Sequence, residues 1–194
     1  MNHIYTQTLS TPRLTLRRAE MKDAEKLFEN WGRHDDTTRY VLWDTHKDVF
    51  DTRVFLRTWV NSYVSSDVYR WIIVITETDE PVGTISVGSM NKLMGICDVG
   101  YSIGPSFWGK GYATEALGAV VEFLFTKVRC NKITASYMAE NENSGNVMRK
   151  CGMTQEKLLR NRNLSTSTRK IKTDVFVYSL KREEYFSSED SGTL

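Results

Sequence analysis

The chain has 194 residues, which is the length of one globular domain. Hydrophobic residues make up 40% of it and charged residues 26%, a balance that excludes an intrinsically disordered or a fibrous chain. The 26 Lys and Arg residues and 24 Asp and Glu residues give a net charge of +2. This small net charge gives no reason to expect a polyanionic partner, and we expect no direct nucleic-acid partner.

The apolar stretches and the cysteines indicate the setting in which the protein works. Apolar runs such as 71–75 are far shorter than the roughly 20 residues that span a bilayer, so no membrane partner is expected. Residues 1–10 are polar and lack the apolar segment of a signal peptide. Cys97, Cys130 and Cys151 are widely spaced, and neither they nor the histidines have the ligand spacing of a metal site. We therefore expect a reduced, cytoplasmic protein without a metal.

The first third of the chain predicts one short strand and two helices. Leucines alternate with polar residues over 13–18, which is typical of a half-buried strand. Apolar residues recur at helical spacing over 23–31, and Gly32 ends this first helix. The same spacing predicts a longer helix over 48–60.

In the rest of the chain the spacing of the apolar residues changes. Residues 69–76 and 81–87 predict a β-hairpin, and 96–103 predicts a further strand. A strongly amphipathic helix is expected over 109–128. The remaining predicted elements are a strand over 131–137, a short helix over 143–151, and two strands over 153–159 and 173–180.

This order of elements favours an α+β fold. A mostly antiparallel sheet with helices packed on it fits better than a sheet of strictly alternating strands and helices. Residues 1–186 are expected to form a single domain. Residues 187–194 are acidic with nothing to bury, which predicts a disordered tail.

The most informative segment is 104–116, which joins a predicted strand to the amphipathic helix. Gly109, Gly111 and Ala113 are small enough to let a ligand approach the backbone closely. The first N–H groups of a helix lack intrahelical partners and therefore suit a phosphate, and Lys110 adds a positive charge nearby. A plain helix cap with two convenient glycines is the alternative. The spacing matches neither a Walker loop nor a dinucleotide-binding fingerprint.

The stretch 108–116 resembles the acetyl-CoA pyrophosphate loop of the GNAT acetyltransferases. Nearly the whole chain is similar to the RimJ/RimL-like branch, which contains ribosomal-protein N-terminal acetyltransferases. The other motifs that carry the resemblance occur in family order, at 11–17, 82–85, 98–101, 141–144, 147–153 and 174–180. The resemblance implies a twisted, mostly antiparallel sheet flanked by helices, in which strands 98–103 and 131–137 splay apart to form the acetyl-CoA cleft.

The same resemblance implies which residues hold acetyl-CoA, the expected co-substrate. The pantetheine arm would pair with the backbone of Tyr101, Ser102 and Ile103. The remaining implied contacts are Trp108, Gly109, Lys110, Gly111, Tyr112, Ala113, Thr114 and Asn141. Trp108 stands where the generic loop has Gln or Arg, which removes one phosphate-side contact.

Transfer of an acetyl group to an amine requires a neutral amine, a polarised thioester and a proton source for the departing thiolate. By the family's Asn-x-x-Ser motif, Ser144 would protonate the thiolate and Asn141 would bind pantetheine or a catalytic water, although both are also ordinary turn residues. Asp98 matches the family acid before Gly-Tyr and is the candidate base; a structural pair with Lys or Arg is the alternative. Many GNAT enzymes carry a tyrosine that acts as the acid where this chain has Met148. This difference favours Ser144 as the acid, or an enzyme that works mainly by holding the two reactants close together. Glu115 is interpreted as structural.

The acceptor side is less informative. The run 34–39 contains two aspartates that would attract a cationic amine, but a solvated loop is favoured. The basic residues over 157–162, with Arg169, Lys170 and Lys172, are interpreted as the exposed edge of a hairpin rather than an RNA-binding surface.

The predicted function is acetyl-CoA-dependent transfer of acetyl to a primary amine, by resemblance a protein N-terminal α-amine. Two alternatives stay open: acetylation of a small amine (a polyamine, an amino acid or an antibiotic), and a catalytically idle acetyl-CoA sensor. A homodimer also stays open.

Overall fold

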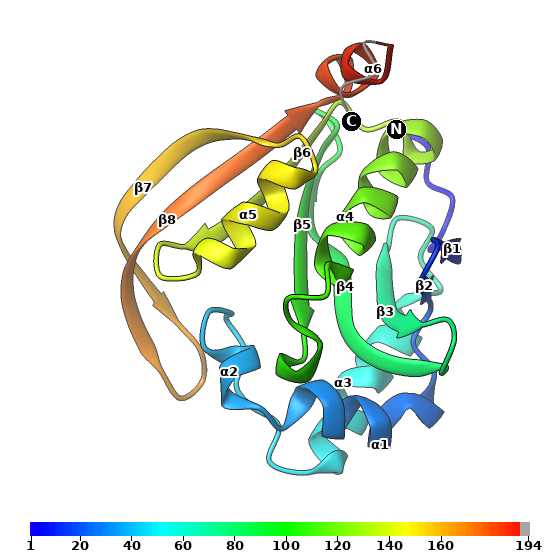
Figure 1. Ribbon diagram of the computed structural model, residues 1–194, viewed down its shortest axis with the longest axis vertical. Helices are drawn as coiled ribbons and strands as arrows, with labels where there is room; N and C mark the ends of the chain where they lie inside the picture. The colour runs from blue at the N-terminus through cyan, green and yellow to red at the C-terminus, as the bar shows by residue number, and fades with distance from the viewer. Residues whose placement is uncertain (191–194) are drawn as a thin grey trace.

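An eight-stranded sheet forms the centre of the computed structural model, which describes residues 1–190, with side chains described to Ser187 (Figure 1). The strands are β1 (Leu9–Ser10), β2 (Leu14–Arg17), β3 (Arg70–Ile75), β4 (Glu80–Asn91), β5 (Ile96–Ile103), β6 (Lys132–Met138), β7 (Thr154–Ser165) and β8 (Lys170–Lys181). Their order across the sheet is β1-β2-β3-β4-β5-β6-β8-β7, and only β5 and β6 pair in parallel. The predicted mostly antiparallel α+β fold is confirmed.

Helices cover both faces of this sheet. They are α1 (Ala24–Leu27), α2 (Asp35–Thr38), α3 (Val49–Ser62), α4 (Tyr112–Phe123), α5 (Glu142–Lys150) and α6 (Arg182–Asp190), with π-helical turns at Phe28–Gly32 and Leu124–Val128. Short 3-10 turns lie at Met21–Asp23 and Pro105–Phe107. No helix within residues 1–190 has both the length and the apolar surface needed to cross a bilayer.

Strand β3 shows why two layers of helices are needed, because it is buried on both faces. Trp71 and Ile73 belong to the core cluster that includes the apolar stripe of α4. Ile72 and Val74, which alternate with them, belong to the cluster formed with α1 and α3. Helix α3 begins where predicted, because the side chain of Asp48 caps it by accepting hydrogen bonds from the first backbone N–H groups.

The centre of the sheet opens between β5 and β6. These strands pair only from Ile96 to Asp98 on β5, against Lys132 to Thr134 on β6. Beyond that point β6 continues along β8 to Met138, whereas β5 continues along β4 to Ile103. The two central strands therefore splay as the resemblance implied.

Some boundaries differ from those predicted. Strand β4 continues to Asn91, and β7 and β8 each have 12 residues, so the C-terminal hairpin is longer than expected. Helix α6 continues to Asp190, past Ser187, where the predicted tail 187–194 begins; residues 191–194 lie outside the described residues. Tyr185 of this helix is buried against Phe125, with ring centroids 5.3 Å apart. In the described part of the chain Cys97 and Cys130 are free, buried thiols, and Cys151 is free and partly buried.

Candidate active site

A cleft of about 530 Å³ lies where β5 ends, bounded by α2, the start of α4 and α5. Most of the residues implied by the sequence line it, namely Tyr101, Ser102, Ile103, Trp108, Gly109, Gly111, Tyr112, Ala113, Thr114, Asn141 and Ser144. Two implied residues do not, Lys110 and Asp98. Residues of α2 and its following turn, together with Phe107 and Lys150, also line the cleft; the sequence had pointed to Asp36 through the acidic run 34–39 but had assigned no site role to the others.

The floor of the cleft is the splayed end of β5. From Val99 to Ile103 this strand pairs with β4 on one side and has left β6 on the other. Backbone groups on the open side of an unpaired strand edge are ready to pair with an extended chain. The backbone of 101–103 therefore suits the amide-bearing pantetheine arm.

The mouth of the cleft is the glycine turn before α4. Gly109 and Gly111 have φ values of 74° and 82°, a left-handed conformation that favours glycine, and a Cβ at Gly109 would meet open space. The first helical bond of α4 is donated by the N–H of Glu115 to the carbonyl of Gly111 at 3.1 Å. The N–H groups of the preceding residues, Tyr112 to Thr114, thus have no partner in the helix and fit a pyrophosphate. Lys110 lies exposed beside this turn, with its ammonium 5.1 Å from the centre of the Phe107 ring.

A brace of hydrogen bonds from the turn between β1 and β2 holds this glycine turn. Arg13 donates to the carboxylate of Glu115 through its Nε (2.7 Å) and its backbone N–H (2.9 Å), and to the carbonyl of Lys110 through Nη1 (2.8 Å). Thr11 adds a hydroxyl donor to Glu115 at 2.6 Å. Although burial raises the pKa of Glu115, these hydrogen bonds leave it below its ordinary value. Glu115 is therefore structural, as expected, but through this brace rather than through the helix dipole alone.

We expect Glu115→Ala to weaken acetyl-CoA binding by about 10-fold, the equivalent of one lost charge-assisted hydrogen bond. Without Glu115, Arg13 loses the partner that aims it at the carbonyl of Lys110, so the turn is no longer held. Calorimetric titration of acetyl-CoA measures the change. Glu122→Ala is the matched control, because it removes the same side chain from an exposed position of α4. Equal affinities of the two variants would contradict the role of the brace.

Ser144 contacts Tyr101 at the first turn of α5, which begins after Asn141. The backbone N–H of Ser144 donates to the carbonyl of Asn141 at 3.0 Å, which closes the turn into the helix. The hydroxyl of Tyr101 donates to the carbonyl of Ser144 at 2.9 Å and so ties β5 to α5 across the cleft. Burial raises the pKa of Tyr101, so this hydroxyl keeps its proton. Met148 is buried in the main core and does not line the cleft.

Asp98 lies at the point where β5 and β6 part. It does not line the cleft, and its carboxylate accepts a hydrogen bond of 2.8 Å from the hydroxyl of Thr134 on β6. The alternative expectation of a Lys or Arg partner is wrong for the described residues, since this threonine takes that place. Burial raises the pKa of Asp98, against the lowering effect of the Thr134 hydrogen bond.

The raised pKa of Asp98 predicts how its replacement changes stability with pH. A carboxyl whose pKa is raised by folding contributes stability below its ordinary value of 3.8, and loses it as the pH rises through the folded-state value. Asp98→Asn keeps an acceptor for Thr134 without the charge. We expect the variant to match the wild type near pH 3.5 and to be more stable at pH 7, by roughly 1 kcal/mol. Urea unfolding at both pH values measures this difference in stability. If Asp98 were instead a catalytic base, the acetylation rate of Asp98→Asn would fall below that of the wild type at pH 7, and the deficit would narrow by about pH 9.5, where α-amines are neutral.

Another part of the cleft lining is formed by α2 and its following turn. Asp36, Thr37, Tyr40 and Val41 line the cleft there. The expected solvated loop over 34–39 is therefore wrong, because α2 forms within it and buries Thr37. Asp36 is the only carboxylate among the described lining residues, and it lies 3.8 Å from the guanidinium of Arg39.

The basic residues of the β7–β8 hairpin divide into two groups. Lys157, Arg160, Arg162, Lys170 and Lys172 are exposed, as expected of a hairpin edge. Arg169 is instead half-buried and bonded to the turn after α2, so its assignment to the exposed edge is wrong.

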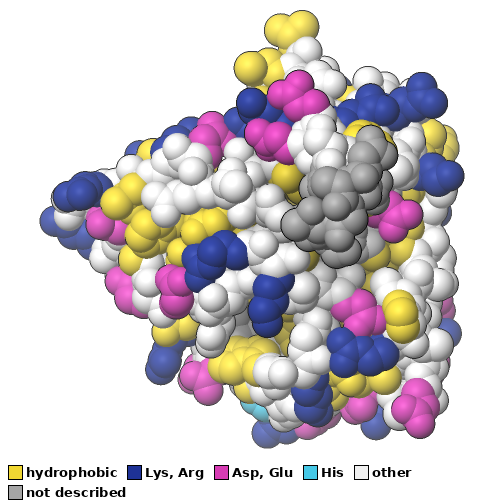
Figure 2. Space-filling view, turned by 45° about the horizontal axis from the view of Figure 1, so that its top comes forward, with side chains coloured by type: hydrophobic (Ala, Val, Ile, Leu, Met, Phe, Trp, Pro, Cys, Tyr) yellow, Lys and Arg dark blue, Asp and Glu magenta, His cyan; other side chains and the backbone are white. Residues whose placement is uncertain are grey.

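On the face shown in Figure 2, Lys and Arg side chains lie among Asp and Glu side chains. Within the described residues, no group of three or more His, Cys, Asp or Glu side chains is arranged to hold a metal.

Comparison with known proteins identifies the family to which the chain belongs. The chain matches the model of the acetyltransferase (GNAT) domain over residues 13–154. It is 32% identical over 179 residues to the "uncharacterized N-acetyltransferase p20" of Bacillus licheniformis, covering 92% of this chain and 98% of p20. Over 60 residues, 31% of each chain, it is 37% identical to the ribosomal protein uS5-alanine N-acetyltransferase of Escherichia coli. The crystal structure of a GNAT-family acetyltransferase from Bacillus anthracis superposes with a TM-score of 0.79 at 23% identity, over 92% of this chain and all of that one. The chain thus belongs to the GNAT acetyltransferase family and is an N-acetyltransferase that uses acetyl-CoA as its co-substrate.

Proposed function

We propose that this enzyme acetylates the α-amine at the N-terminus of a protein. The observation that carries the proposal is the mixed lining of the cleft, in which a glycine turn and an open strand edge occur together with α2 and its carboxylate. The glycine turn and the strand edge suit acetyl-CoA, which leaves α2 for the acceptor. Similarity over 60 residues to an enzyme named for acetylating an N-terminal alanine of ribosomal protein uS5 favours a protein acceptor.

In this proposal the residues of α5 and β5 serve the acetyl end of the co-substrate. Acetyl-CoA supplies the thioester, and Ser144 gives a proton to the departing thiolate. Asn141, at the entry to α5, holds the pantetheine or a catalytic water. Tyr101 fixes the first turn of α5 through its hydrogen bond to the carbonyl of Ser144, so that these groups keep their places.

The acceptor amine must lose a proton before it attacks. An α-amine has a pKa of about 7.7 to 8.0, so a useful fraction is neutral at pH 7, whereas a lysine amine near 10.4 is almost fully protonated. Asp98 lies outside the cleft, where it does not reach the acceptor directly. An enzyme that captures the neutral fraction would therefore favour α-amines over lysine side chains.

Release of the CoA thiol with a panel of acceptors tests the proposal. The panel contains peptides that begin with Ala, Ser or Thr and carry an internal lysine, and the same peptides with a blocked α-amine. Spermidine, free amino acids and an aminoglycoside represent small amines. Turnover of the free peptides, with none of the blocked ones, is expected. Turnover confined to the small amines would replace the proposed acceptor with that class.

A further inference from the structure

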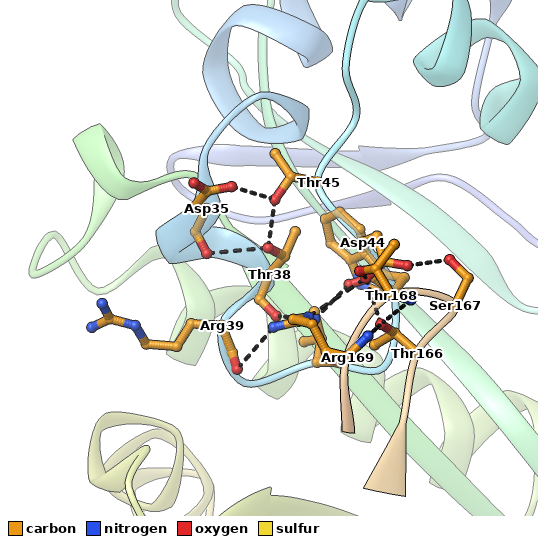
Figure 3. Close-up of polar contacts among 11 residues, drawn as sticks. Asp35, Thr38, Arg39, Asp44, Thr45, Thr166, Ser167, Thr168 and Arg169 are labelled. Atoms are coloured by element: carbon orange, nitrogen blue, oxygen red, sulfur yellow. Dashed lines mark hydrogen bonds and ion pairs between the residues drawn. The ribbon is translucent and has the colours of Figure 1, made fainter. Parts of the chain in front are cut away.

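The tip of the β7–β8 hairpin is hydrogen-bonded to the turn that follows α2 (Figure 3). Arg169, in the hairpin, donates through Nη2 to the carbonyls of Thr38 (3.0 Å), Val41 (3.2 Å) and Trp43 (3.0 Å). Its Nη1 reaches the carbonyl of Arg39 at 3.5 Å. One guanidinium thus organises the carbonyls of a whole turn, which a planar group with five donors is suited to do.

The turn after α2 in its own right supplies a carboxylate, that of Asp44, to the hairpin tip. Asp44 accepts hydrogen bonds from the hydroxyls of Thr166 (2.5 Å), Thr168 (2.6 Å) and Ser167, and lies 3.5 Å from Nε of Arg169. Hydrogen bonds from Ser167, then Thr166 and Thr168, hold the pKa of Asp44 well below its ordinary value. We refer to Asp44, Thr166, Ser167, Thr168 and Arg169 as the clasp.

A second set of hydrogen bonds joins the clasp to α2 itself. Thr45, next to Asp44, donates to the carboxylate of Asp35 at 2.7 Å, and its hydroxyl lies 2.7 Å from that of Thr38. The hydroxyl of Thr38 also donates to the carbonyl of Asp35 at 3.1 Å. Both ends of α2 are therefore connected to the clasped turn.

Helix α2 needs such support. It has four residues, whereas isolated helices shorter than about 12 residues are marginal in water. It nevertheless supplies Asp36 and Thr37 to the wall of the cleft. Thr37 is 6% exposed, and its hydroxyl is the one buried side-chain polar atom in the described part of the chain without a hydrogen-bond partner. An unpaired buried hydroxyl lowers stability, which indicates that α2 is placed for a ligand rather than for the fold.

We propose that Arg169 is a positioning residue for the acceptor: through the clasp, the hairpin tip fixes α2 as the acceptor-side wall of the cleft. The inference rests on the proposed function for the identity of the acceptor, but the clasp acts on α2 in the free enzyme. The hydrogen bonds and the ion pair of the Arg169 guanidinium all go to residues 38–44, and none goes to the glycine turn or to α5. Loosening the clasp should therefore change the KM for the acceptor and leave acetyl-CoA binding and the chemical step in place.

Arg169→Met tests this, because it keeps the length of the side chain and removes its donors. In hydrogen exchange of the free enzyme, amides over 34–46 should exchange at least about 10-fold faster. With a peptide that begins with Ala, KM should rise about 10-fold and kcat should change less than about 3-fold. The Kd of acetyl-CoA should stay within about 2-fold. Arg169→Lys, which keeps the charge and three donors, should recover part of the loss in both readouts.

Arg162→Met is the matched control, because it removes an exposed arginine from the same hairpin, and it should match the wild type. Asp44→Asn is a second variant if Arg169→Met folds poorly. Unchanged exchange over 34–46, or a loss confined to kcat or to acetyl-CoA affinity, would overturn the inference. If the wild type does not turn over the peptide, the proposed acceptor fails, and the KM comparison is made with spermidine. The exchange experiment uses no acceptor and decides the role of the clasp in either case.

Discussion

Gly111→Val is expected to lower the affinity for acetyl-CoA by about 100-fold while the protein stays folded. Gly111 has a φ of 82°, which costs an L-residue about 1–2 kcal/mol and a β-branched one more, so the turn should shift to relieve the strain. A Cβ there would also lie 3.3 Å from Nη2 of Arg13, the residue that holds the turn. A loss of about 2.7 kcal/mol from both effects corresponds to the 100-fold change.

Gly118→Ala separates this effect from any general sensitivity of α4 to larger residues. Gly118 lies within α4, and a Cβ there meets no atom within 4 Å. Alanine in a helix interior is favoured over glycine by about 1 kcal/mol, so this variant should be more stable and bind acetyl-CoA normally. Calorimetry on both variants, with thermal unfolding to verify the folded state, completes the test. Normal binding by Gly111→Val would place the pyrophosphate elsewhere.

The cofactor side of the cleft was predictable because its signal is local. Gly109, Gly111 and the helix that follows lie within a few residues of one another, so their spacing suits an anion-binding turn as well as a plain helix cap, and the family resemblance favours the former. The splay of β5 from β6 followed from the resemblance. Asp98 was placed correctly on its strand, but sequence cannot show that its carboxylate faces Thr134 on β6 rather than the cleft.

The acceptor side was not predictable for physical reasons. Four residues are too few for a helical period, so α2 leaves no pattern in the sequence. Arg169 stands next to Lys170 in a basic run, and nothing local distinguishes the half-buried arginine from its exposed neighbour. The bonds that do so join it to carbonyls 126 to 131 residues away. Contacts of this kind depend on how the hairpin curls back over α2, which only the folded chain shows.

Ser144→Ala is expected to lower kcat by about 10-fold to 1000-fold, the range for a lost general acid, with little change in the Kd of acetyl-CoA. The thiolate of CoA must be protonated as it leaves, and Ser144 is the hydroxyl that the first turn of α5 brings to the cleft. Ser136→Ala, which removes an exposed hydroxyl from β6, should leave kcat unchanged.

Tyr101→Phe makes this test decisive, because Tyr101 is the other hydroxyl at the same turn. Its proton is engaged by the carbonyl of Ser144, and its raised pKa keeps it a donor throughout the assay range. If Tyr101 only fixes α5, the phenylalanine variant should lose less in kcat than Ser144→Ala. The two losses should then be less than additive in the double variant, since positioning a missing hydroxyl has no further effect and only the placement of Asn141 is still affected. Normal turnover by Ser144→Ala with a large loss in Tyr101→Phe would move the acid to Tyr101. Normal turnover by both would leave solvent as the proton source and proximity of the bound reactants as the main contribution of the cleft.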